Sequence, residues 1–105
     1  MGGPREMTPE ECRDELLSHV HRLIAWWLNE SRAVTPREKM EGLAFSILSA
    51  LDGCAGALPR FAVTPSPHPE AAAYHRGRGE NWWPTGCDLG PLQEHFHRPR
   101  PGVTW

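Results

Sequence analysis

Apolar residues in the first half of the chain recur at intervals of three and four, the spacing that places them on one face of an α-helix. Thr8-Pro9-Glu10-Glu11 is typical of a helix start, because the threonine hydroxyl can accept from free backbone N–H groups while Glu11 closes a capping box. The pattern predicts a helix from about Pro9 to Asn29. Its apolar stripe contains Cys12, Leu16, Val20, Leu23, Ile24, Trp27 and Leu28, with Leu17 at its edge.

A second helix start follows at Thr35-Pro36-Arg37-Glu38, and Asp52-Gly53 supplies a stop. The apolar stripe between them contains Met40, Leu43, Ala44, Ile47, Leu48 and Leu51. Because only a few residues separate the two helices, we expect an antiparallel helical hairpin over residues 9–52, with Cys12 and Cys54 buried as small hydrophobic residues. Roughly opposite the second stripe lie the small residues Gly42, Ser46, Ser49 and Gly53, and we expect the C-terminal half to fold against them.

The second half of the chain is rich in proline, since eight of the eleven prolines fall between Pro59 and Pro101. Regular elements there must be short: a strand at 60–64, a helix from Pro69, and a last helical turn or two over 91–97. The predicted fold is therefore mainly α, with at most one or two short strands. We expect one domain over 1–105, formed by the hairpin, a loop-dominated half at 54–97 that drapes over it, and an extended, mobile tail at 98–105.

Composition narrows the classes of function. The formal net charge of −2 gives no long-range field for a polyanion, so nucleic acid is not the expected partner. Three widely spaced cysteines argue against a disulfide framework and favour a reducing cytoplasm. No run of apolar residues predicts a secretion signal or a membrane span.

A metal site is the alternative that the reactive side chains leave open. Cys87 with His95-x-His97 offers three ligand types that suit zinc, and His68, His75 and Glu80 form a second candidate set. The spacing of Cys87 and His95-x-His97 matches no zinc signature, and loop histidines are more often solvated, so we expect no cofactor. His19 and His21 point to different flanks of one helix and cannot chelate together. No nucleophile elbow is present, which argues against an enzyme.

Adjacent tryptophans mark the most unusual segment, Glu80-Asn81-Trp82-Trp83-Pro84. Both rings either fill the gap between loops and hairpin or are in part exposed as anchors of a protein interface. Trp26 lies off the first apolar stripe, where it either covers the second half or remains exposed for a partner. The exposed arrangement predicts a binding surface that contains Trp82, Trp83, Trp26, Asn81 and Glu80.

Two stretches of the chain also resemble a known group of proteins. These are Glu41–Gly53 and the segment from Pro67-His68-Pro69 through Tyr74-His75 to Gly79-Glu80-Asn81-Trp82-Trp83-Pro84. Over residues 36–84 the chain resembles a family of small uncharacterised proteins encoded by phages and prophage-like elements. The resemblance implies an accessory role inside a bacterial host cell, without a known reaction or catalytic residues.

The leading hypothesis is therefore a non-enzymatic protein-binding module, with inhibition of a host defence complex as one form of that role. The alternative is a small zinc-binding protein or metal-dependent enzyme that uses the C-terminal histidines and cysteine. Because Trp26 lies on the flank of the predicted hairpin, a homodimer also remains open.

Overall fold

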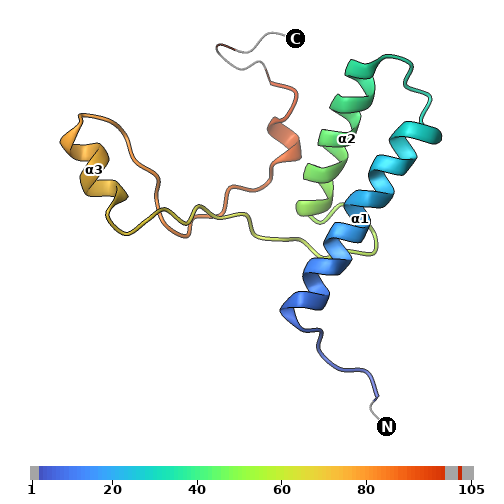
Figure 1. Cartoon of the computed structure of the whole chain (residues 1–105), viewed down its shortest axis with the longest axis horizontal. Helices are drawn as coiled ribbons and strands as arrows, with labels where there is room; N and C mark the ends of the chain where they lie inside the picture. Colours follow the sequence, from blue (N-terminus) through green and yellow to red (C-terminus); the bar gives the residue numbers. More distant parts are fainter. Residues whose placement is uncertain (1–2, 99–101, 103–105) are drawn as a thin grey trace.

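Two antiparallel helices form the N-terminal half of the computed structural model, which describes residues 3–98 and 102 (Figure 1). Helix α1 spans Pro9–Asn29 and α2 spans Pro36–Leu51, so the predicted hairpin is confirmed. Thr8 Oγ1 accepts from the Glu11 amide at 3.2 Å, and Glu11 Oε1 accepts from the Thr8 amide at 2.9 Å. Both halves of the predicted capping box are thus present. Gly53, with φ at 87°, ends the second helix in a conformation that favours glycine.

The hairpin interface is built on the small-residue face of α2. A side-chain carbon at Gly42 would stand 2.2 Å from Cη2 of Trp27, so the indole lies directly on the glycine. Trp27 Nε1 also donates to Ser46 Oγ at 3.0 Å. At this end of the stripe our expectation was wrong, because α1 and not the C-terminal half covers the small residues. Consequently Met40, on the apolar stripe of α2, is left exposed.

The other end of the small-residue face does receive the C-terminal half. The Ser49 hydroxyl donates to Gln93 Oε1 at 2.8 Å. The Asp52 carboxylate accepts from the amides of Leu92, at 2.8 and 2.9 Å, and of Gln93, at 2.7 Å. These bonds anchor the 3₁₀ turn η1 (Gln93–His95) to the end of α2. The short helical turn predicted within 91–97 is therefore present and packs against α2.

An arm, residues 61–89, extends away from the hairpin and carries the short helix α3 (Ala71–Gly77) at its tip (Figure 1). Among the described residues, α3 contacts no other helix. Arg60 and Asp88 form an ion pair at the base of the arm, where the Leu89 amide donates to the Val63 carbonyl at 2.8 Å. The expectation that residues 54–97 drape over the hairpin is therefore wrong for the arm and holds only for the segment around η1.

The predicted strand at 60–64 is absent from the described part of the chain. This segment is extended, but it exchanges only isolated hydrogen bonds with the returning chain. Besides the bond to the Val63 carbonyl, the Gly86 amide donates to the Pro65 carbonyl at 3.2 Å. Because the nearby prolines lack an N–H donor, a regular ladder cannot form.

The arm makes the molecule flat and open, with extents of 51 × 49 × 18 Å. Its radius of gyration is 18.0 Å, whereas a compact domain of this length has about 13 Å. Ala50 is the only buried residue among those described. Cys12 and Cys54 are exposed, which corrects their predicted burial: α1 begins beyond the end of α2, and Cys54 lies in the loop after it (Figure 1).

Two further predictions concern the chain end and the membrane. Apart from Arg98 and Gly102, the predicted extended tail lies outside the described residues. Within the described ranges, no helix combines the length and the apolar character needed to cross a bilayer.

Candidate binding surfaces

Both adjacent tryptophans are exposed near the tip of the arm. Trp82 is 44% exposed and Trp83 is 64% exposed. The Arg76 guanidinium carbon stands 4.7 Å from the centre of the Trp82 ring, in a cation–π contact that supports one face of the indole. The interpretation that both rings fill the gap between loops and hairpin is therefore wrong. The arm carries them away from the hairpin.

Glu80 holds the chain that leads to these tryptophans. Its Oε1 accepts from Arg78 Nε at 3.0 Å and lies 3.2 Å from His75 Nδ1. Arg78 also donates to the Tyr74 hydroxyl at 3.2 Å. Glu80 thus connects the end of α3 to the tryptophan loop, while the predicted binding residue Asn81 is exposed beside it. We call Tyr74, Arg76, Trp82 and Trp83 the arm tip.

Trp26 does not join the arm tip. It lies on α1, half exposed, with its ring edge on Trp27 at a centroid distance of 5.0 Å. Figure 1 shows the C-terminal end of α1 and the arm helix α3 on opposite sides of the molecule. The structure therefore divides the predicted binding residues between two separate surfaces.

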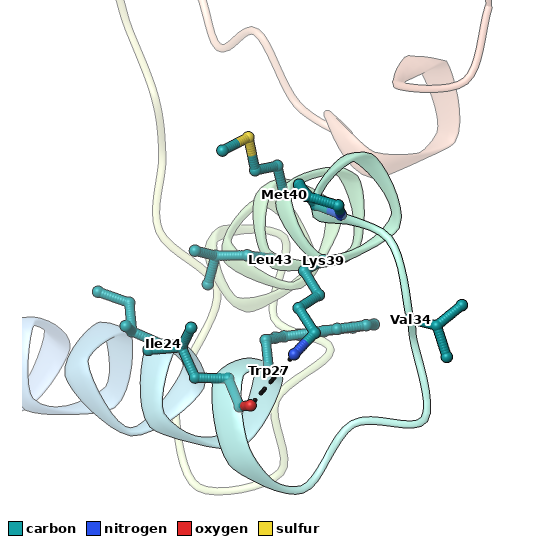
Figure 2. Close-up of a pocket in the computed structure, with 8 residues that line it drawn as sticks. Ile24, Trp27, Val34, Lys39, Met40 and Leu43 are labelled. Atoms are coloured by element: carbon teal, nitrogen blue, oxygen red, sulfur yellow. Dashed lines mark hydrogen bonds between the residues drawn. The ribbon is translucent and has the colours of Figure 1, made fainter.

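A second apolar surface is the groove between α1 and α2 near their connecting loop (Figure 2). Its volume is about 410 Å³, and Lys39 is the one charged residue among those that line it. The Lys39 ammonium donates to the Leu28 carbonyl at 3.2 Å, a bond drawn as a dashed line in Figure 2. The lining residues are Ile24, Trp27, Leu28, Val34, Pro36, Lys39, Met40 and Leu43.

Most of these groove residues belong to the apolar stripes of the two helices, and the stripes predicted that they lie in the core. The width of those stripes was the signal in the sequence that could have predicted an open groove. Two helices in contact cover one narrow face of each other, so a wide stripe leaves apolar side chains uncovered unless a third element packs there. The arm extends elsewhere, and the groove stays open.

Several of the candidate metal ligands make other contacts. His97 stacks on Phe45 at a centroid distance of 5.2 Å and lies 3.3 Å from Glu41 Oε1. His75 Nδ1 lies 3.2 Å from Glu80 Oε1, and Cys87 is exposed on the segment of the arm that returns to the hairpin. Across the described residues, no three His, Cys, Asp or Glu side chains come together as a metal-ligand group.

Among the described residues, two carboxyl groups have clearly displaced pKa values, and each of them stabilises the local structure. The Arg60 guanidinium beside Asp88 holds the pKa of that carboxyl below its ordinary value, with help from the Gly90 amide. Arg5 lowers the pKa of Glu11 to about 2, and the Thr8 amide acts in the same direction. The first group fixes the base of the arm and the second fixes the start of α1.

The chain matches no protein-family model, no curated protein and no solved structure. Its function is therefore inferred from the geometry of the arm tip and the groove.

Proposed function

We propose that this chain is a non-enzymatic protein-binding module whose arm tip anchors it to another protein. The observation that carries this proposal is the presentation of Trp82 and Trp83 on an arm that contacts no other described helix. Exposed tryptophans of this kind are typical hot spots of protein interfaces, because an indole buries a large area and fixes few rotatable bonds.

The arm tip is organised for binding before a partner arrives. Arg76 supports Trp82, and Glu80 ties His75 to Arg78, so the tip loses less conformational entropy on association than a free loop would lose. The mixture of aromatic and arginine side chains is the composition enriched at interface centres. A folded protein surface with an apolar pocket and a carboxylate near Arg76 would complement this tip.

The biological setting is part of the same proposal. The resemblance to small phage and prophage proteins supports an accessory role in the cytoplasm of a bacterial host cell. Inhibition of a host defence complex is one form of that role, because blocking an assembly requires a docking surface and no catalytic group.

The proposal is tested by quantitative capture from bacterial lysate with four baits. These are the wild-type chain, the Trp82→Ala/Trp83→Ala variant, Trp26→Ala, and the exposed control Met7→Ala. We expect a specific protein that wild type, Trp26→Ala and Met7→Ala retain and the double variant loses. The purified partner should then bind wild type with a blue shift of indole fluorescence and bind the double variant at least about tenfold more weakly.

Equal binding by a folded double variant would contradict the proposal. Salt-sensitive binding of the arm to single-stranded nucleic acid, with no protein retained, would also overturn it, because aromatic and arginine side chains can stack on bases as well.

A further inference from the structure

The chain exposes far more surface than a compact protein of its size. Its accessible surface is 8504 Å², whereas a monomer of 11.8 kDa normally exposes about 5,900 Å². The difference of about 2,600 Å² is comparable with what one subunit of an obligate homodimer buries, about 1,000–2,500 Å² or more. Part of this surplus belongs to the arm. The hairpin contributes a face on which the exposed side chains are mainly apolar.

That face is a seam along α1. Asp14, Leu17, His21, Ile24 and Leu28 follow one another at spacings of three, four, three and four residues, and all five are exposed. Leu17 is 50% exposed and Leu28 is 62% exposed. Ile24 and Leu28 belong to the wall of the groove, whereas Leu17 stands two turns earlier as a separate projection. Each chain thus carries both an apolar projection and an apolar groove on the same face.

We propose that the groove and this seam bind a second copy of the chain, so that two hairpins associate through antiparallel α1 helices. In an isologous two-fold interface both copies use the same surface. A face that carries both a projection and a groove suits such an interface, because each copy can insert its projection into the groove of the other. With the axis between residues 22 and 23, Leu17 of each copy enters the groove of the other beside Leu28. The two Ile24 side chains then lie near the axis, and the two hairpins form a four-helix arrangement.

Charge selects the antiparallel direction. Lys39 donates to the Leu28 carbonyl and therefore stands where α1 ends, while Asp14 lies one turn before Leu17 at the opposite end of the seam. Antiparallel pairing brings Asp14 of one copy toward Lys39 of the other. Parallel pairing would instead align like charges, Asp14 with Asp14 and Lys39 with Lys39. His21 and Asp14 are the polar members that fix the register.

Analytical ultracentrifugation of the full chain tests this interface. We expect wild type to sediment with the mass of two chains and Leu17→Asp with the mass of one. Leu89→Asp, an equally drastic change at an exposed leucine of the arm, should remain dimeric. Circular dichroism should show the same helix content in all three, because Leu17 makes its proposed contact outside its own hairpin.

Charge reversal tests the direction of pairing. Asp14→Lys should raise the dimer dissociation constant by about tenfold, and adding Lys39→Glu to it should restore most of the affinity. A monomeric wild type, a dimeric Leu17→Asp, or a double reversal that binds no better than Asp14→Lys would overturn the proposal. Loss of the dimer in Trp82→Ala/Trp83→Ala would also overturn it, because the interface would then lie on the arm.

Discussion

The first turn of α1 is held by a small group of polar side chains. Glu11 accepts from the Thr8 amide and, at 2.8 Å and 3.0 Å, from the Arg5 guanidinium. The Thr8 hydroxyl oxygen in turn accepts from the Glu11 amide. The same carboxylate therefore closes the cap and orders the residues before the helix. Negative charge at this end also complements the helix dipole.

The charge of Glu11 makes the start of α1 sensitive to acid. Its pKa falls from an ordinary 4.5 to about 2 in the folded chain, so the folded state binds the proton less readily. The cap is fully present above about pH 4.5 and is lost as the pH falls toward about 2. We expect part of the helical circular dichroism signal to disappear over that interval. Glu11→Gln should lose this part of the transition, whereas Glu10→Gln should keep it.

At the scale of elements, the hairpin depends on one close approach. The Trp27 ring lies on Gly42, and its indole nitrogen is fixed by Ser46. The glycine weakens α2 as a helix by about 1 kcal/mol relative to alanine, but it permits this contact. The interface therefore favours a residue that helix propensity alone would reject.

Gly42→Ala should destabilise the hairpin even though it favours the helix. The added methyl would meet the indole at 2.2–2.6 Å, and overpacking of this kind costs about 1–3 kcal/mol. We expect the thermal midpoint to fall by about 4–8 °C per kcal/mol of net loss. Gly77→Ala is the matched control, because position 77 is helical and open, and it should not lower the midpoint. A stabilised Gly42→Ala would contradict this packing.

At the scale of the whole molecule, the hairpin and the arm are joined by few contacts. Arg60 and Asp88 close the base of the arm, and Asp88 Oδ1 also accepts from the Gly90 amide at 2.9 Å. Beyond that point the arm is held by its own residues. The chain thus presents two surfaces in different directions, one on the hairpin and one at the arm tip.

Asp88→Asn should loosen the arm without disturbing the hairpin. Because the ion pair is partly exposed, its loss is expected to speed amide exchange at Gly86 and Leu89 by only about two- to fivefold. Amides in the middle of α1 and α2 should exchange at unchanged rates. Glu6→Gln, at an exposed position before α1, serves as the control for removal of one acidic group. Equal acceleration in the hairpin would show that arm and hairpin open as one unit.

The elements that depend on neighbours along the chain could be predicted from the residue pattern alone. Both Thr-Pro starts, the Asp52-Gly53 stop and the helical spacing give α1 over Pro9–Asn29 and α2 over Pro36–Leu51, because capping and periodicity are local properties. Exposure of Trp82 and Trp83 was one of the two arrangements that the sequence predicted. Their separation from Trp26 was not predicted.

Which faces of the helices meet depends on packing between distant parts of the chain. Apolar stripes predict that α1 and α2 pack, but shape complementarity between Trp27 and Gly42 selects the small-residue face and leaves Met40 exposed. The prolines of the second half rule out long elements without fixing where the chain goes. Its direction depends on long-range contacts such as Asp52 with Leu92 and Arg60 with Asp88, which no local pattern encodes.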